Sequence, residues 1–281
     1  MNRTGITTSH DIRRRTGELG VAPRKALGQH FLVSHAILQH ILQAAELSPD
    51  DVVVEVGPGL GVLTDEIARR VRRLITIELD RKIASCLTER YATSGNVEVV
   101  WDDARTVDYA ALLGSATTYK VVANLPYYAA SPIIRRFLES QPKPRLMVVT
   151  VQKEVAQNMT AHAGQMSLLS VATQFYAHPL IVCYVPPRAF HPAPRVSSAV
   201  MRLDVYDKPV ISVDSETGFF GVVRAGFCAP RKQLRNALTQ GLGRPVAVIE
   251  NILAQAGIDH KRRAETLTLQ EWGKLCHAAS R

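Results

Sequence analysis

The spacing of hydrophobic positions changes several times along the chain and predicts alternating strands and helices. Five short runs are apolar and rich in β-branched residues, as buried strands are. They are Val52–Val56, Leu74–Ile77, Val97–Val100, Lys120–Ala123 and Leu146–Val151. Segments with helical spacing follow the strands. They are Val62–Arg72, Arg81–Tyr91, Pro132–Leu138 and Lys153–Met159. This alternation predicts an α/β fold, a Rossmann-like parallel sheet with helices on both faces.

Local signals refine this prediction. Ser34 is placed to cap an amphipathic helix that runs to Glu46, and Ser131-Pro132 supplies a cap and a first-turn proline for the helix that follows. Two further strands are expected around Ala172–Tyr176 and Val196–Val205, which would complete a mixed sheet.

After Val205 the pattern becomes helical. A capping box, Thr268 with Glu271, marks the start of the last helix. The expected helices are Asp214–Phe227, Arg231–Gln240, Val246–Ala256 and Leu269–Ala278. We therefore predict a basic N-terminal extension over residues 1–21, a catalytic domain over 22–207 and a small helical domain over 208–281.

Charge adds a candidate partner. The 281 residues carry a formal net charge of +9, and the excess of Lys and Arg lies in residues 1–30 and 205–281, whereas the middle is nearly neutral. Basic ends predict two contacts with a polyanion such as RNA, although two solvated tails would give the same pattern.

The remaining composition favours a cytoplasmic protein. The four cysteines are far apart and form no C-x-x-C pair, so they are expected to be reduced thiols. No apolar run has the length of a membrane span. An organellar transit peptide near Arg13-Arg14-Arg15 is an alternative, but Asp11 and Glu18 argue against it. No long heptad pattern is present, so we expect a monomer.

A glycine-rich loop follows the first strand. The sequence from Glu55 to Gly61 has the spacing E-x-G-x-G-x-G, with Gly57 and Gly59 inside it, and a helix comes next. A dinucleotide fingerprint would need glycine at the position of Val62. The spacing found instead resembles the first motif of methyltransferases that use S-adenosyl-L-methionine.

Two strand ends supply carboxylates for the same cofactor. Glu78 closes the second strand, where an acid accepts hydrogen bonds from ribose hydroxyls. Asp102 and Asp103 close the third strand, and a carboxylate there is placed to accept a hydrogen bond from the adenine amino group of the cofactor. We choose Asp103.

The fourth strand leads into Asn124, Leu125, Pro126 and Tyr127. The exocyclic amine of adenine is a poor nucleophile because its lone pair is delocalised into the ring. The Asn124 amide oxygen and the carbonyl of Leu125 or Pro126 would accept its two hydrogens and free that lone pair, while Tyr127 stacks on the base. A turn with an Asx bond is the simpler alternative.

A proline-rich block from Phe190 to Ser198 is the third motif, and Phe190 is expected to be a second stacking face. We assign His191 a structural role. We expect no metal site, because His30, His35 and His40 recur every five residues and would scatter around a helix.

In this order the motifs resemble the rRNA adenine N6,N6-dimethyltransferases, and most closely their small-subunit branch. The similarity runs from about Ala22 to the C-terminus. The motifs that carry it are Lys25–Leu32, Glu55–Gly61, Asn124–Tyr127, Gln152–Glu154, Phe190–Ser198 and Arg231–Asn236.

The resemblance implies dimethylation of two adjacent adenosines in a hairpin loop near the 3′ end of small-subunit rRNA, within an assembling subunit. It also implies cofactor contacts at His30, Leu32, Gly57, Glu78, Asp103 and Asn124. We further expect Arg231, Lys232 and Arg235 to contact RNA.

Two positions depart from the family pattern. The family often has Asn at the position of His30, and Ala229-Pro230 interrupts the start of the basic helix. Three alternatives stay open at this point: a large-subunit rRNA methyltransferase of the resistance type, a DNA adenine methyltransferase, and a largely non-catalytic assembly or nucleic-acid-binding factor.

Overall fold

The computed structural model describes residues 28–280 together with residues 12, 16, 17 and 24. These residues form two compact units. The first contains the described residues up to 156 and residues 180–207, and the second contains residues 157–179 and 208–280. The predicted boundary after residue 207 is one junction between the units. Residues 157–179, predicted to belong to the catalytic domain, group with the C-terminal helices instead.

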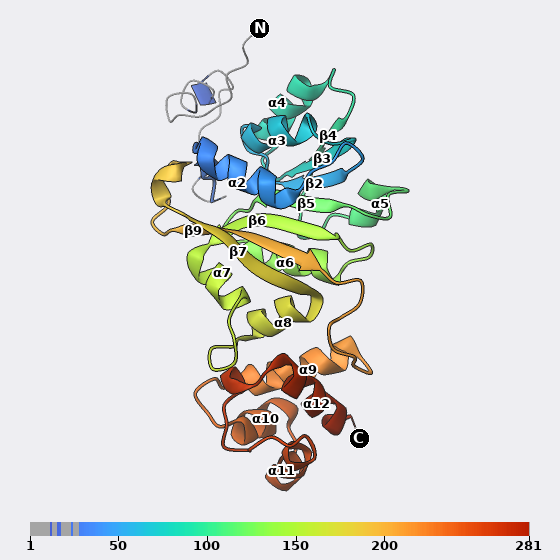
Figure 1. Ribbon diagram of the computed structural model, residues 1–281, viewed down its shortest axis with the longest axis vertical. Coiled ribbons are helices and arrows are strands. Elements are labelled where there is room, and N and C mark those ends of the chain that lie inside the picture. The colour runs from blue at the N-terminus through green and yellow to red at the C-terminus, as the bar shows by residue number, and fades with distance from the viewer. Residues whose placement is uncertain (1–11, 13–15, 18–23, 25–27, 281) are drawn as a thin grey trace. The chain divides into compact units, whose positions relative to one another are not determined.

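The first unit is built on a seven-stranded sheet with the order β4-β3-β2-β5-β6-β9-β7 (Figure 1). Strands β2 to β6 pair in parallel, and β9 pairs antiparallel with β6. Their bounds are β2 Val52–Val56, β3 Arg73–Glu78, β4 Val97–Trp101, β5 Lys120–Asn124, β6 Leu146–Gln152, β7 Ala177–Val185 and β9 Ser198–Val205. The strand order reverses between β2 and β5, and ligands of such sheets bind at this point.

Helices cover both faces of the sheet. Connections between parallel strands are right-handed, so the reversal of strand order sends the helices before and after β4 to opposite faces. The helices are α2 His35–Ala45, α3 Val62–Ala68, α4 Arg81–Tyr91, α5 Tyr109–Leu113 and α6 Ala130–Glu139. The predicted α/β fold, a Rossmann-like sheet with helices on both faces, is therefore confirmed.

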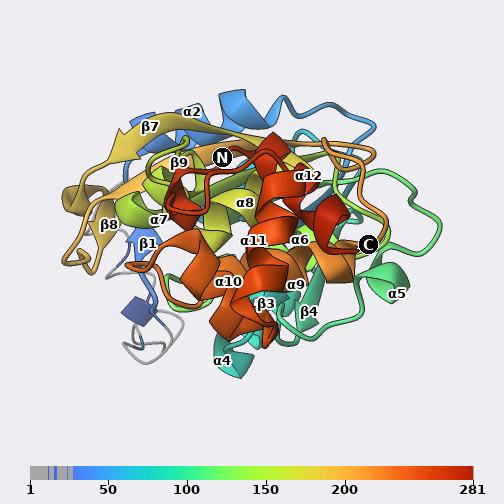
Figure 2. The same cartoon turned by 90° about the horizontal axis from the view of Figure 1, so that it is seen from below.

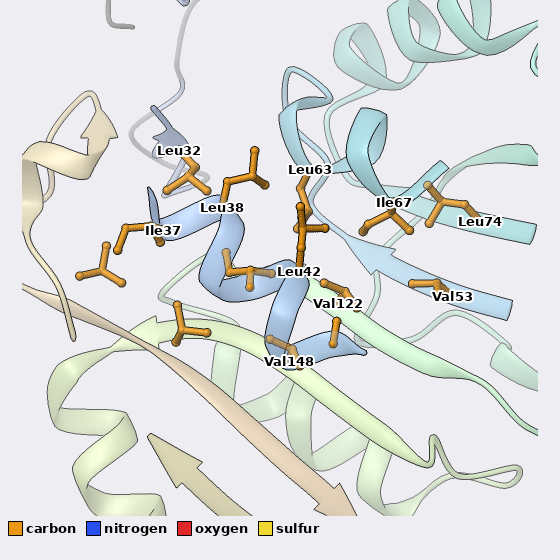
Figure 3. Close-up of a cluster of buried hydrophobic side chains, with 14 of the residues drawn as sticks. Leu32, Ile37, Leu38, Leu42, Val53, Leu63, Ile67, Leu74, Val122 and Val148 are labelled. Atoms are coloured by element: carbon orange, nitrogen blue, oxygen red, sulfur yellow. The ribbon is translucent and has the colours of Figure 1, made fainter. Parts of the chain in front are cut away.

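Successive side chains of each strand point to opposite faces of the sheet, and both faces are packed against helices. Figure 3 shows Leu42 of α2 and Ile67 of α3 pointing at Val53, Val122 and Val148, which come from three neighbouring strands. These side chains are buried, and the strand residues between them are buried too because both faces are covered. The Ser34 hydroxyl accepts a hydrogen bond from the N–H of Ile37, as predicted for the start of α2.

Two local predictions around α6 and α8 (Leu168–Tyr176) were wrong. Residues Ala172–Tyr176 lie in α8, and the strand begins only at Ala177. Val171 and Phe175 are one helical turn apart and both buried, so tertiary packing overrides the β propensity of this run. Ser131 does not cap α6, which starts at Ala130 without a side-chain cap.

The second unit contains a group of helices that Figure 2 shows from below. In it the Phe175 ring stacks on the Phe219 ring with 4.7 Å between centroids, and the Tyr176 hydroxyl donates to Glu216 at 2.6 Å. The capping box of Thr268 with Glu271 is present as predicted. The helices after residue 207 are α9 Glu216–Phe227, α10 Leu234–Leu242, α11 Val246–Gln255 and α12 Leu269–Ala279.

Candidate active site

A pocket lies in the first unit at the carboxyl ends of β2, β3, β4 and β5, where the strand order reverses. Three of the predicted motifs line it, together with the carboxylates predicted at the ends of β3 and β4. Its lining residues are 28–32, 55–60, 62, 63, 77–79, 102–104, 124–129 and 133. Lys25, Ala26 and Leu27, which begin the first motif, lie outside the described residues.

The glycine loop presents backbone to this pocket at Gly57 and Gly59. Gly57, Gly59 and Gly61 all have positive φ, a conformation that L side chains rarely adopt. A Cβ on Gly59 would lie 2.9 Å from two carbons of the Phe31 ring. The loop is therefore closed to larger residues, and a ligand meets bare backbone beside the start of α3.

Glu78 is buried at the end of β3. Its Oε2 accepts the N–H of Gly59 at 3.3 Å, and its Oε1 accepts the N–H of Asp80 at 2.8 Å. Burial raises the pKa of this carboxyl group, and the two backbone donors oppose the rise. The Glu78 carboxylate thus links the glycine loop after β2 to the end of β3, and it does so at the pocket.

Asp103 has a different environment. The Arg105 side chain donates to both of its oxygens, from Nε at 3.0 Å and from Nη2 at 2.5 Å. This ion pair holds the pKa of Asp103 below its usual range. Asp102 also lines the pocket, and its Oδ1 accepts the N–H of Asp103 at 2.6 Å.

Asn124 lies at the end of β5 with a fixed amide. Its Nδ2 donates to the carbonyl oxygen of His30 at 3.0 Å, so the amide oxygen is the end left for a ligand. The Pro126 carbonyl accepts the N–H of Ala129 at 3.0 Å, which closes the turn before α6. Among the described residues, the Leu125 carbonyl has no such bond.

The Tyr127 and His30 rings stack on each other at the pocket. Their ring centroids are 5.3 Å apart with an angle of 29° between the planes. The Tyr127 hydroxyl lies 2.5 Å from the Ser198 hydroxyl, and His30 Nδ1 lies 2.7 Å from the Pro192 carbonyl. Both ends of the proline-rich block therefore position residues of the pocket.

Phe190 itself lies elsewhere. It is 3% exposed, it pairs with Leu32 in the two-stranded ladder of β1 (Phe31–Leu32) and β8 (Phe190–His191), and it packs into the core beside α2. It does not line the pocket. The structure thus gives Phe190 a packing role and not the predicted stacking face, because its ladder with Leu32 turns the ring inward.

Several pocket residues were missed by sequence reasoning, and three of them have notable environments. Glu55 is buried, accepts the Thr64 hydroxyl at 2.7 Å, and has its pKa raised to about 8 by burial. Leu79 and Tyr128 also line the pocket and are exposed. Each of the three lies within a predicted motif or next to a predicted site residue, and this proximity in sequence was the signal that could have identified them.

The three basic residues predicted to contact RNA are in the second unit. Arg231 and Lys232 are exposed but precede α10, which starts at Leu234 and not at residue 231. Arg235 is partly buried and pairs with Glu250 at 2.7 Å. Pro230 accounts for the late start, because a turn closes from Lys232 to Ala229 at this point.

Within the part of the chain that the structure describes, no group of three or more potential metal ligands is found. No helix among the described residues is long and apolar enough to span a membrane.

A sheet of this order with a glycine loop after β2, a carboxylate after β3 and an Asn-Leu-Pro-Tyr segment after β5 defines a class I methyltransferase that uses S-adenosyl-L-methionine. The model of the family described as ribosomal RNA adenine dimethylase matches residues 21–275. The chain belongs to this family and is an rRNA adenine dimethyltransferase.

Curated relatives agree over most of the chain. The ribosomal RNA small subunit methyltransferase A of Dehalococcoides mccartyi strain 195 is 48% identical over 253 residues, which cover 90% of this chain and 87% of the relative. The protein of the same name from Moorella thermoacetica is 44% identical over 268 residues, covering 92% and 93%.

Solved structures show the same fold. The crystal structure of the 23S rRNA methyltransferase ErmE is 28% identical with a TM-score of 0.70, and the match covers 89% of this chain and 100% of that one. A dimethyladenosine transferase from Plasmodium falciparum, 24% identical, has a TM-score of 0.75 and coverage of 88% and 96%.

Proposed function

We propose that this enzyme dimethylates N6 of two adjacent adenosines in a hairpin loop near the 3′ end of small-subunit rRNA, within an assembling subunit. The small-subunit assignment is supported by relatives of that name at 44–48% identity, against 28% for the large-subunit enzyme. We also propose that it acts in the cytoplasm as a monomer.

The pocket fits the cofactor. The glycine loop presents backbone to the pocket, with no room for a Cβ at Gly59 beside the Phe31 ring, and Glu78 presents a buried carboxylate next to it for ribose hydroxyls. Asp103 would accept a hydrogen bond from the adenine amino group of the cofactor. The backbone at His30, Leu32 and Gly57 would line the rest of the pocket. When bound, S-adenosyl-L-methionine supplies an electrophilic methyl group on sulfur.

The observation that carries the reaction is the orientation of Asn124. Because Nδ2 is held by the His30 carbonyl, the Oδ1 atom is left to accept one hydrogen of the target amine. The Leu125 carbonyl supplies the second acceptor more readily than Pro126, whose carbonyl already closes a turn. Two acceptors favour a pyramidal nitrogen with an available lone pair.

The remaining steps need positioning and no general base. Tyr127 would stack on the target adenine, and the Ser198 and His30 contacts fix its ring. These residues would hold the amine in line with the methyl group that the cofactor would supply on sulfur, and solvent would take the proton, which is acidic once the nitrogen is alkylated. Alignment of the two centres supplies most of the rate gain.

The test is radiolabelled methyl transfer from S-adenosyl-L-methionine to purified small subunits, large subunits and duplex DNA, each from a strain without this activity. N6,N6-dimethyladenosine formed only in small subunits is the expected result. Transfer only to large subunits would show the resistance-type activity. No transfer with particle binding intact would show a non-catalytic assembly factor.

A further inference from the structure

Tyr128 differs from its neighbour Tyr127. The Tyr127 ring meets His30 and its hydroxyl meets Ser198, whereas Tyr128 is 48% exposed at the same pocket. Gly28 supports the Tyr128 ring from one side, because a Cβ on Gly28 would lie 3.4 Å from its Cδ1. A ring that is held in this way and half open to solvent at the mouth of a pocket is available for stacking.

Arg105 completes this feature. Its guanidinium carbon lies 6.0 Å from the centre of the Tyr128 ring. Nε and Nη2 donate to the Asp103 carboxylate, which fixes the plane of the guanidinium. Among the described residues, Nη1 donates to no acceptor, and the side chain is 46% exposed. A cation with one open edge therefore lies beside an open aromatic ring.

We propose that Tyr128 and Arg105 bind the nucleotide next to the target adenosine, and the inference rests on the proposed function. The neighbouring base stacks on the Tyr128–Arg105 pair, and its phosphate accepts from Arg105 Nη1. Bases that leave a helical stack need a new stacking partner, and Tyr and Arg serve this purpose in single-stranded RNA recognition. The enzyme thus selects an adenosine whose neighbour is also unpaired.

A second pair in the same unit serves as a control. Arg81 lies 5.0 Å from the Trp101 ring, and Trp101 is 58% exposed. Neither residue lines the pocket.

If Arg105 only held Asp103 in place, substitutions of Arg105 would change cofactor affinity and substitutions of Tyr128 would change nothing. Tyr128 is therefore the residue to vary.

The experiment compares the wild type with Tyr128→Ala, Tyr128→Phe and Trp101→Ala on small subunits from the deficient strain. Steady-state methyl transfer gives KM for the particle. In complexes with S-adenosylhomocysteine, 2′-hydroxyl acylation measures the mobility of the nucleotides on both sides of the target. The affinity of each variant for S-adenosylhomocysteine, measured by calorimetry, shows whether its cofactor pocket is intact.

We expect Tyr128→Ala to raise KM by between about fivefold and about a hundredfold, the usual range for loss of one stacked base. One flanking nucleotide becomes reactive, while Tyr128→Phe and Trp101→Ala behave as the wild type. Equal protection in Tyr128→Ala and wild type, or no protection by the wild type, would overturn the inference while leaving methyl transfer intact. Absence of transfer by the wild type would overturn the proposed function as well.

Discussion

At the scale of single residues, Glu55 links the pocket to stability. The carboxyl group is 1% exposed and its pKa rises from 4.5 to about 8 because burial disfavours its charge. Between these two values the folded state keeps a proton that the unfolded state has lost. Stability contributed by this proton is therefore complete below about pH 4.5 and is lost as pH rises toward 8.

We predict that Glu55→Gln removes this pH dependence. A glutamine keeps an acceptor for the Thr64 hydroxyl and carries no charge at any pH. Relative to the wild type, the free energy of unfolding of the variant should improve by about 1.4 kcal/mol per pH unit as pH rises from 5 to 8. Urea unfolding of the cofactor-free protein at several pH values measures this. Parallel pH profiles for the two proteins would contradict the prediction.

Asn124 is the residue on which the chemistry depends. We predict that Asn124→Ala lowers the single-turnover rate by at least about a hundredfold, since it removes one acceptor from the reacting amine. Particle binding should persist, because it depends on other surfaces. Rapid-quench methyl transfer and filter binding measure the two quantities. A variant that keeps full activity would refute the proposed mechanism.

At the scale of elements, α9 and α10 approach so closely that one glycine is obligatory. A Cβ on Gly241 would lie 2.5 Å from the Cα of Ala225. Gly221 is also within a helix of this unit, but a Cβ there would meet no atom within 4 Å. The two glycines are thus chemically identical and differ only in what lies beside them.

This contrast gives a matched pair of substitutions. Gly221→Ala should stabilise the protein by about 0.5–1 kcal/mol, because alanine favours the helix. Gly241→Ala should destabilise it by about 1–3 kcal/mol, because the helices must separate. Chemical denaturation distinguishes the two. Changes of the same sign would show that α9 and α10 pack differently.

Elements were predictable where local pattern and tertiary packing agree. The strands β2 to β6 are short apolar runs rich in β-branched residues, and their alternation with helical segments identifies them. Residues 172–176 failed because a β-branched and aromatic run can pack as a helix when its partners, such as Phe219, come from a distant part of the chain. Ser131 failed as a cap because a turn formed by backbone atoms starts α6 two residues before the predicted Pro132, at Ala130.

The site was predictable to the extent that its residues lie in motifs. Glycine spacing and strand ends located Gly57, Glu78 and Asn124, all of which line one pocket. Their roles toward ligands stay predictions. Phe190 could not be placed from sequence, because only the ladder with Leu32 decides which way its ring points.

At the scale of the whole molecule, the excess positive charge predicts salt-sensitive binding. Arg231 and Lys232 are exposed, whereas Arg235 already pairs with Glu250. We predict that Arg231→Glu and Lys232→Glu each reduce the slope of log binding constant against log salt by about 0.7–0.9, one phosphate contact apiece. Arg235→Glu should change the slope less.

Binding to deficient small subunits between low and moderate salt measures these slopes. Arg224→Glu is the matched control, because Arg224 is exposed in the same unit and its reversal changes net charge equally. An equal loss of slope in the control would show a general field effect. Unchanged slopes for Arg231→Glu and Lys232→Glu would show that neither residue touches RNA.

The second unit is built from two stretches that are separate in the sequence, and the order in which they are synthesised affects how the unit folds. Residues 157–179 leave the translating ribosome before residues 208–281, yet Phe175 packs against Phe219 and Phe220, which belong to the later stretch. The apolar side of α8 therefore stays uncovered until the last helices have been made, a state that attracts chaperones and proteases. A nascent chain truncated before α9 cannot complete this unit. We therefore expect incomplete copies to expose α8 and to be degraded.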